Sequence, residues 1–251
     1  MSTKNREQKD KKEDIDLDNL SKVWDDYAKI YNKLFATPLF KGMRNQLLNS
    51  LISCRGGIIH DGGCGTGSYL KGILEKTQAS KIIATDISSE MIKKAKETVS
   101  KLPKEYQNKI EFYQMDLTKE WPQEIFDAQI FQQLMNYLPY RGWKKIIEMS
   151  YKTMKDGGYI YSGTYLKGFN VKELAKNHTL EQIIKTPPSS YPAMLKSSKI
   201  LSVFDKLEEK DIIILPTKDE YLEYHKEIGF KNIEITGEFT WGAGIIVRAQ
   251  K

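Results

Sequence analysis

Residues 58–69, IIHDGGCGTGSY, combine an acidic side chain with three glycines at alternate positions. The β-branched residues that open this stretch predict a buried strand, and the residues that follow the glycines predict a helix. Glycine at positions 63, 65 and 67 removes side chains from the turn, so that a ligand can lie against bare backbone amides. The stretch therefore predicts a binding site with Asp61 beside the ligand.

Three classes of ligand use such a glycine turn. A nucleoside triphosphate loop needs a lysine after its last glycine, and none follows Gly67 at that spacing. A dinucleotide site needs G-x-G-x-x-G, whereas the chain has Ser68 at the third glycine position, and the carboxylate of Asp61 disfavours a diphosphate. The remaining class is a zwitterionic or cationic cofactor without phosphate, such as S-adenosylmethionine, which a nearby acid helps to bind.

Strand and helix patterns alternate around this turn. Ser88 or Ser89 is expected to cap one helix, and a helix over 141–155 is expected to end at Gly157–Gly158. This alternation predicts a doubly wound α/β fold with a mostly parallel sheet, whose ligands bind beyond the carboxyl ends of the strands. The first five strands are expected at 57–61, 81–86, 109–116, 126–134 and 158–165.

Three segments depart from this alternation. Residues 1–19 have the composition of a flexible tail, which leaves a single domain over 20–251. Residues 166–215 interrupt the rhythm and are interpreted as an inserted cap that recognises the substrate. Near the C-terminus, Gly229 is expected to end a helix, and two strands joined near Trp241–Gly242 are linked too tightly to be parallel.

These motifs resemble those of the class I S-adenosylmethionine-dependent methyltransferases of the small-molecule type. Residues 61–67, DGGCGTG, match the family's D-x-G-x-G-x-G motif, and ATDISSEMIKKAK (84–96) is similar to its second segment. YQMDLTKEW (113–121) resembles the adenine segment, and KDGGYIYSG (155–163) resembles the turn before the fifth strand. The resemblance covers roughly residues 55–165 and 218–251, and it implies a seven-stranded sheet whose last strand is antiparallel.

The resemblance implies roles for the residues at matching positions. Asp86 would accept hydrogen bonds from both ribose hydroxyls, and Asp116 would accept one from the exocyclic amine of adenine. Tyr31, on the first helix, would cover the sulfonium by a cation–π contact. Gln132 ends the fourth strand, where relatives make a backbone contact with the cofactor. The residues expected to bind the cofactor are Tyr31, Asp61, Gly63, Gly65, Asp86, Ile87, Met91, Asp116, Leu117 and Gln132.

The motifs say less about the methyl acceptor. LMNYLPY (134–140) resembles the V-L-H-H-L-P-D run of small-molecule methyltransferases, but Asn136 and Tyr137 replace its histidines, so no acid–base role is carried over. The stretch lacks the N-P-P-Y-type motif of adenine- and glutamine-modifying relatives and the cysteine of C5-pyrimidine enzymes. His60 replaces an aliphatic residue and is expected to point into the core. Candidates for substrate contact are Tyr27, Tyr137, Tyr165, His178 and Tyr191, and no catalytic residue is assigned.

Composition narrows the class of partner. The formal net charge is +6, but the lysines are scattered, which disfavours a nucleic-acid partner. The two cysteines lie in no metal-spaced pair and the three histidines are far apart in the sequence, so no metal site is expected and a reducing, cytoplasmic setting is favoured. No stretch is long and apolar enough to span a membrane.

The sequence therefore predicts transfer of a methyl group from S-adenosylmethionine to a small organic acceptor at an O, N or C atom. One alternative is a methyltransferase that acts on RNA or protein, which would carry a contiguous basic patch beside the pocket. A second is a protein that binds S-adenosylmethionine without chemistry, and a third is a nicotinamide enzyme. The sequence makes no prediction of the oligomeric state.

Overall fold

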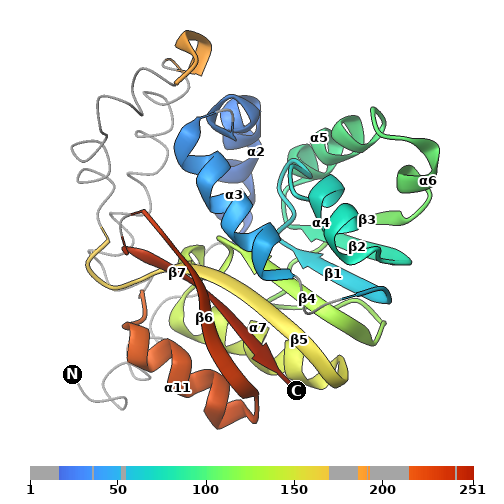
Figure 1. Ribbon diagram of the computed structural model, residues 1–251. Helices are drawn as coiled ribbons and strands as arrows, with labels where there is room; N and C mark the ends of the chain where they lie inside the picture. Colours follow the sequence, from blue (N-terminus) through green and yellow to red (C-terminus); the bar gives the residue numbers. More distant parts are fainter. Residues whose placement is uncertain are drawn as a thin grey trace.

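A mixed sheet of seven strands forms the centre of the protein, as the computed structural model shows (Figure 1). The strand order is β3-β2-β1-β4-β5-β7-β6. β1 pairs in parallel with β2 and with β4, whereas β7 pairs antiparallel with β5 and β6. The predicted fold class is thus confirmed. The strands are β1 Ile58–Gly62, β2 Lys81–Asp86, β3 Ile110–Gln114, β4 Phe126–Gln132, β5 Met154–Tyr165, β6 Lys231–Phe239 and β7 Gly244–Gln250.

Part of the expected cap and tail lies outside the residues that the structure describes. Residues 1–16, His178 and Tyr191 are among those outside it, as is most of the segment 166–215. The structure describes residues 17–35, 37–51, 55–169, 186–190, 192, 215–240 and 242–251.

Helices cover both faces of the sheet. α3, α4 and α5 pack on one face through side chains such as Leu47 and Ile73, while α7 and α11 pack on the other through Trp143 and Tyr221. Figure 1 shows α2 beside α3 and α5, against which it packs. The helices are α2 Leu17–Phe35, α3 Pro38–Ser50, α4 Leu70–Thr77, α5 Ser89–Val99, α6 Lys104–Gln107, α7 Tyr140–Lys152 and α11 Lys218–Ile228, with 3-10 turns η2 Met135–Tyr137 and η3 Pro188–Ser190. No helix in the described ranges is long and apolar enough to cross a membrane.

Local sequence signals explain several helix ends. Ser88 is the N-cap of α5, where its hydroxyl accepts a hydrogen bond from the amide of Met91. Thr217 and Glu220 form a capping box at the start of α11, and Gly229 ends that helix at φ +112° as predicted. α2 begins at Leu17, three residues before the expected start of the domain.

The structure differs from the sequence prediction at Gly157–Gly158. α7 ends at Lys152, and both glycines lie inside β5 rather than after a helix. Phe126 already pairs with Met154, and the ladder shifts register before it resumes beyond the glycines. Gly157, at φ +80°, permits this irregularity, so the prediction that these glycines end the helix is wrong.

Candidate functional site

The glycine turn joins β1 to α4 at the carboxyl end of the sheet. The amides of Gly63 and Cys64 donate to the carbonyl of Thr85 at 2.8 and 2.9 Å, which fastens the turn to β2. Gly63 and Gly65 have φ values of +75° and +54°, a region that favours glycine. The turn can therefore bring bare backbone to the edge of a ligand site.

A pocket opens beside this turn, and its space of about 770 Å³ continues into solvent. The wall of the pocket has two parts, one beside β2 and β3 and one beside β4, and Trp24 of α2 belongs to the second. The β2–β3 end is lined by Asp86, Ile87, Met115, Asp116 and Leu117, and the β4 end by Trp24, Gln132, Gln133, Leu134 and Tyr137.

Asp86 is the last residue of β2, and the backbone holds its carboxylate in place. Oδ2 accepts a hydrogen bond from the amide of Gly65 at 2.8 Å, and Oδ1 accepts one from the amide of Ser88 at 3.0 Å. Each oxygen keeps a lone pair for a ligand. Burial raises the pKa of Asp86 to about 6, while the two amide bonds act in the opposite direction. The carboxylate is therefore mostly ionised at neutral pH.

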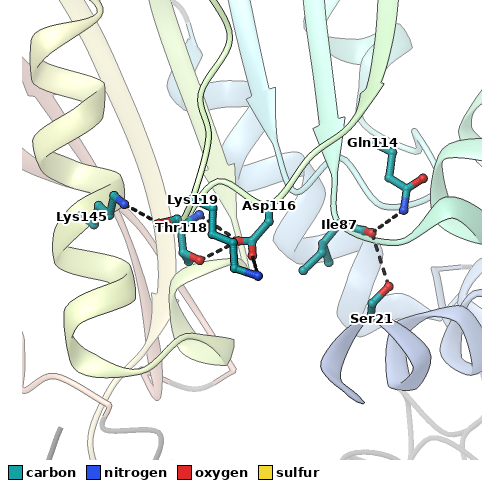
Figure 2. Close-up of polar contacts among 7 residues, drawn as sticks. All are labelled: Ser21, Ile87, Gln114, Asp116, Thr118, Lys119 and Lys145. Atoms are coloured by element: carbon teal, nitrogen blue, oxygen red, sulfur yellow. Dashed lines mark hydrogen bonds and ion pairs between the residues drawn. The ribbon is translucent and has the colours of Figure 1, made fainter. Parts of the chain in front are cut away.

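Asp116 lies in the loop after β3, where neighbouring residues orient it (Figure 2). Its Oδ1 accepts hydrogen bonds from the amide and the hydroxyl of Thr118 at 2.9 and 2.6 Å. Its Oδ2 lies 3.3 Å from Nζ of Lys119, but it is buried and accepts no hydrogen bond from the described residues. An acceptor oxygen is thus left for a donor group of a ligand.

Ile87 follows Asp86 and lines the same end of the pocket. Its carbonyl accepts hydrogen bonds from Gln114 at 3.3 Å and from Ser21 at 3.4 Å, the two contacts drawn in Figure 2. With the loop fixed in this way, Ile87 and Leu117 present apolar surface next to the Asp116 carboxylate. This combination suits a flat apolar ring that carries a hydrogen-bond donor on its edge.

Helix α2 supplies an aromatic wall. Trp24 and Tyr31 line the pocket, and the ring of Tyr27 lies 5.5 and 5.2 Å from their rings. Trp24 also contacts Tyr137 edge-to-face, with the ring centroids 4.7 Å apart. The wall therefore joins α2 to the turn after β4.

Two side-chain hydrogen bonds fasten α2 to the loops of the sheet. The hydroxyl of Ser88 donates to Asp25, and the hydroxyl of Thr66 in the glycine turn donates to Asn32 at 2.6 Å. The helix is thus bonded to the cap of α5 and to the glycine turn, which are both part of the pocket's surroundings.

Gln132 ends β4 and lies against Gly163 of β5, its pairing partner. A Cβ at Gly163 would lie 2.1 Å from Oε1 of Gln132, so only glycine leaves room for this amide. Gln132 is 9 % exposed, and neither its Oε1 nor its Nε2 has a hydrogen-bond partner in the described residues. A buried polar group of this kind calls for a ligand or water partner.

Asp61 is buried on β1 and is not among the residues that line the pocket. Its Oδ2 has no hydrogen-bond partner in the described part of the chain. Burial, with a smaller contribution from Asp86, raises the pKa of Asp61 to about 7. The carboxyl therefore changes charge near neutral pH.

Comparison with known proteins identifies this arrangement. The family model described as a methyltransferase domain matches residues 59–158, which contain the glycine turn, Asp86 and Asp116. Residues 59–158 form a methyltransferase domain. A curated relative, an uncharacterized protein of Haemophilus influenzae, is 31% identical over 109 residues, or 41% of this chain. The match spans only 42% of that relative's length.

Solved structures share the fold of the whole described sheet. The DhpI–SAH complex has a TM-score of 0.61 at 16% identity, and the match covers 92% of this chain and 94% of that one. The N-methyltransferase NodS of Bradyrhizobium japonicum, in complex with S-adenosyl-L-homocysteine, has a TM-score of 0.59 at 13% identity, covering 86% of this chain and 88% of that one. At these identities the likeness establishes the fold.

The loops of the methyltransferase domain and α2 bring the predicted cofactor residues together. Every one of them except Asp61 lines the pocket: Tyr31, Gly63, Gly65, Asp86, Ile87, Met91, Asp116, Leu117 and Gln132.

The substrate-contact candidates are less concentrated. Tyr137 lines the pocket, whereas Tyr27 and Tyr165 are buried and do not line it. The ring of Tyr165 stacks on Phe169 at 3.7 Å. Burial raises the pKa of Tyr165 to about 12, so its hydroxyl stays protonated at neutral pH.

Several pocket residues were not predicted from the sequence. Trp24 had a usable signal, because it precedes Tyr31 by seven residues and so lies two turns away on the same face of a helix. Gln133 had none, because its left-handed backbone, with φ +62°, cannot be read from its residue type. The missed residues are Trp24, Met115, Thr118, Gln133, Leu134, Leu138 and Ile146.

Other polar residues of the methyltransferase domain are part of its core. His60 is fully buried, lies 2.9 Å from the Thr85 hydroxyl and stacks on Phe126, as predicted. Burial lowers its pKa to about 4, so it is neutral. Burial raises the pKa of the Cys64 thiol, which argues against a nucleophile there. The described residues contain no cluster of three or more histidine, cysteine or acidic side chains that could hold a metal.

Proposed function

We propose that the chain transfers the methyl group of S-adenosylmethionine to a small organic acceptor. The observation that carries this proposal is the Asp86 carboxylate, fixed by two backbone amides where the glycine turn meets the pocket. A fixed carboxylate with free lone pairs matches the two neighbouring hydroxyls of a ribose. No lysine, arginine or histidine in the described ranges lines the pocket, which favours a nucleoside without phosphates.

The β2–β3 end suits the adenine ring. Ile87 and Leu117 would hold its faces. Oδ2 of Asp116, which accepts no hydrogen bond from the described residues, would accept one from the amino group of the ring. Met91, on the first turn of α5, adds apolar surface. These three kinds of contact distinguish a purine nucleoside from a generic apolar ligand.

The amino-acid part of the cofactor would extend from the ribose toward β1 and β4. Asp61 offers a carboxylate with one unpartnered oxygen to the ammonium group, either directly or through water. Tyr31 presents an aromatic ring beside Gly65, since a Cβ at that glycine would lie 3.4 Å from the ring. A ring there can contact a sulfonium through its π face.

When bound, S-adenosylmethionine supplies a methyl group on a positively charged sulfur, which a lone pair of the acceptor displaces in line. The chain's part is to align the acceptor and to exclude water. Burial raises the pKa of Tyr31 and of Tyr137, so neither serves as a base at neutral pH. An acceptor that must lose a proton would therefore need a base other than these two tyrosines.

A small acceptor is favoured over RNA or protein by the character of the β4 end. Trp24 and Tyr137 form an aromatic wall, and no basic side chain in the described residues lines it. A groove for nucleic acid would instead carry lysine or arginine toward phosphates.

Calorimetric titration with S-adenosylmethionine, S-adenosylhomocysteine and NADH, followed by methyl-release assays on a panel of small O, N and C acceptors, tests the proposal. We expect both adenosyl ligands to bind, NADH to compete poorly and at least one small acceptor to be methylated. Tight binding of NADH alone would overturn the proposal, and cofactor binding without turnover on small acceptors, RNA or protein would favour a non-catalytic binding protein.

A further inference from the structure

The β4 end of the pocket holds two consecutive glutamines, and their placement bears on the acceptor if the proposed methyl transfer is correct. Successive residues of a strand point to opposite faces of a sheet. Gln133 leaves the strand at φ +62°, while its backbone N–H still donates a hydrogen bond to the carbonyl of Gly163 at 2.9 Å. As a result, Gln132 and Gln133 both line the same pocket.

Three of the four polar atoms of these two side-chain amides lack a hydrogen-bond partner in the described residues. Both polar atoms of the Gln132 side chain, and Nε2 of Gln133, are buried without a hydrogen bond in the described residues. The side chain of Gln133 also interacts with the Tyr165 hydroxyl, which acts against the effect of burial on the pKa of Tyr165. Unsatisfied buried amides cost about 1–3 kcal/mol each, so a bound partner would stabilise the site.

The local packing preserves the Gln132 amide at this place. Gly163 beneath it cannot carry a side chain without contacting Oε1. Two donor nitrogens and the Oε1 acceptor of Gln132, on adjacent residues that line the same pocket, thus make no hydrogen bond within the described residues. Such a set matches a planar group that has a carbonyl oxygen and an N–H beside it.

The charges around this end argue for a neutral partner. No cationic side chain in the described residues lines the pocket, so a carboxylate or phosphate would lose its hydration without compensation. A cationic acceptor would be repelled by the sulfonium whose methyl group it must approach. The flanking rings of Trp24 and Tyr137 suit a flat ring.

We infer that the methyl acceptor is an uncharged planar compound that presents a carboxamide or lactam to Gln132 and Gln133. Its amide carbonyl accepts from the two Nε2 groups, and its N–H donates to Oε1 of Gln132. The ring then lies against Trp24 and Tyr137, and the amide pair determines which acceptors are selected.

Benzamide, benzoate and benzamidine are matched probes, because they share a ring and differ in the charge of the attached group. With the protein saturated with S-adenosylhomocysteine, ligand-observed NMR titration should show benzamide bound about tenfold more tightly than the other two. The isosteric apolar variant Gln132→Met should lose this preference. Gln132→Glu, which replaces the amide with a carboxylate, should shift the preference to benzamidine. Gln123→Met, at an exposed glutamine that does not line the pocket, is the matched control and should behave as wild type.

S-adenosylhomocysteine and 5′-methylthioadenosine, which lacks the amino-acid part, separate the two possible occupants of the amide site. If Gln132→Met weakens only S-adenosylhomocysteine, the glutamine serves the cofactor and the inference is overturned. Equal binding of the three probes, or no detectable benzamide binding, also overturns it. Failure of S-adenosylhomocysteine to bind wild type would instead contradict the proposed function itself.

Discussion

Polar side chains at the two ends of the pocket are held in different ways. At the β2–β3 end, Asp86 is bonded to the amides of Gly65 and Ser88, and Asp116 is bonded to Thr118. At the β4 end, the side-chain amide of Gln132 makes no hydrogen bond with the described residues. The first end is organised by the backbone before a ligand arrives, while the second leaves its amide for a ligand to satisfy.

The difference follows from what each end is proposed to bind. The cofactor is the same in every reaction, so the positions of its hydrogen-bonding groups do not vary. Carboxylates fixed at strand ends can therefore bind it. The acceptor is proposed to bind side chains that have no hydrogen-bond partner in the described residues. The contrast therefore separates residues that set affinity for the nucleoside from residues that select the acceptor.

The largest effect is expected from Asp86→Ala. Loss of two charge-assisted hydrogen bonds to the ribose should weaken S-adenosylhomocysteine binding at least about 100-fold, as measured by calorimetric titration. Asp86→Asn keeps the shape of the side chain and one acceptor oxygen, so its affinity for S-adenosylhomocysteine should fall between those of Asp86→Ala and wild type. Asp156→Ala is a control at an exposed acid, where no change is expected. Unchanged affinity in Asp86→Ala would remove the basis of the nucleoside site.

The two ends also differ in how far the sequence predicts them. Glycine spacing and the acids at strand ends identify Gly63, Asp86 and Asp116, because each position lies at or just after the end of a strand that is visible as a hydrophobic run. Gln133 was not predicted, since its orientation depends on a left-handed residue after β4. The mostly parallel sheet followed from alternation, and the hairpin of β6 and β7 followed from loop length. The strand order was not predicted, and the ends of α7 and β5 depended on pairing between Phe126 and Met154.

Asp61 is an exception at the cofactor side, because its Oδ2 is not bonded by the chain. Its pKa is raised from 3.8 to about 7, so the folded state holds the proton more tightly than the unfolded state. This contribution to stability is fully present below about pH 4 and is lost as the pH rises through about 7. Asp61→Asn should therefore raise the free energy of unfolding of the cofactor-free protein by about 1–2 kcal/mol near pH 8.

Chemical denaturation at several pH values measures this effect. The stability difference between Asp61→Asn and wild type should shrink as the pH is lowered toward about 4. His60 and His225, whose pKa values burial lowers to about 4, make both proteins less stable as the pH falls below the ordinary histidine value, so their contribution cancels in the difference. A difference that does not vary with pH would contradict the raised pKa of Asp61.

Gly163→Ala tests the β4 end without changing a polar group. The new Cβ would lie 2.1 Å from Oε1 of Gln132 and should displace the amide. We expect about a tenfold loss of benzamide affinity with S-adenosylhomocysteine affinity retained, on the scale of one hydrogen bond. Melting temperature and circular dichroism check that the sheet is intact. Loss of affinity for both ligands would show that the two ends are not independent.

Tyr31→Leu should give the smallest effect, because it removes a cation–π contact while a side chain of similar apolar character remains. Such a contact contributes about 0.5–1 kcal/mol at exposed sites and more when desolvated, so affinity for S-adenosylmethionine should fall about fivefold. S-adenosylhomocysteine has no positive charge on sulfur and should lose less, so the ratio of the two dissociation constants reports the charge itself. Tyr31→Phe keeps the ring and should preserve the ratio. If Tyr31→Leu weakens both ligands equally, Tyr31 acts by packing against Gly65 and makes no cation–π contact with the sulfonium. The aromatic wall would then contact only the acceptor at the β4 end.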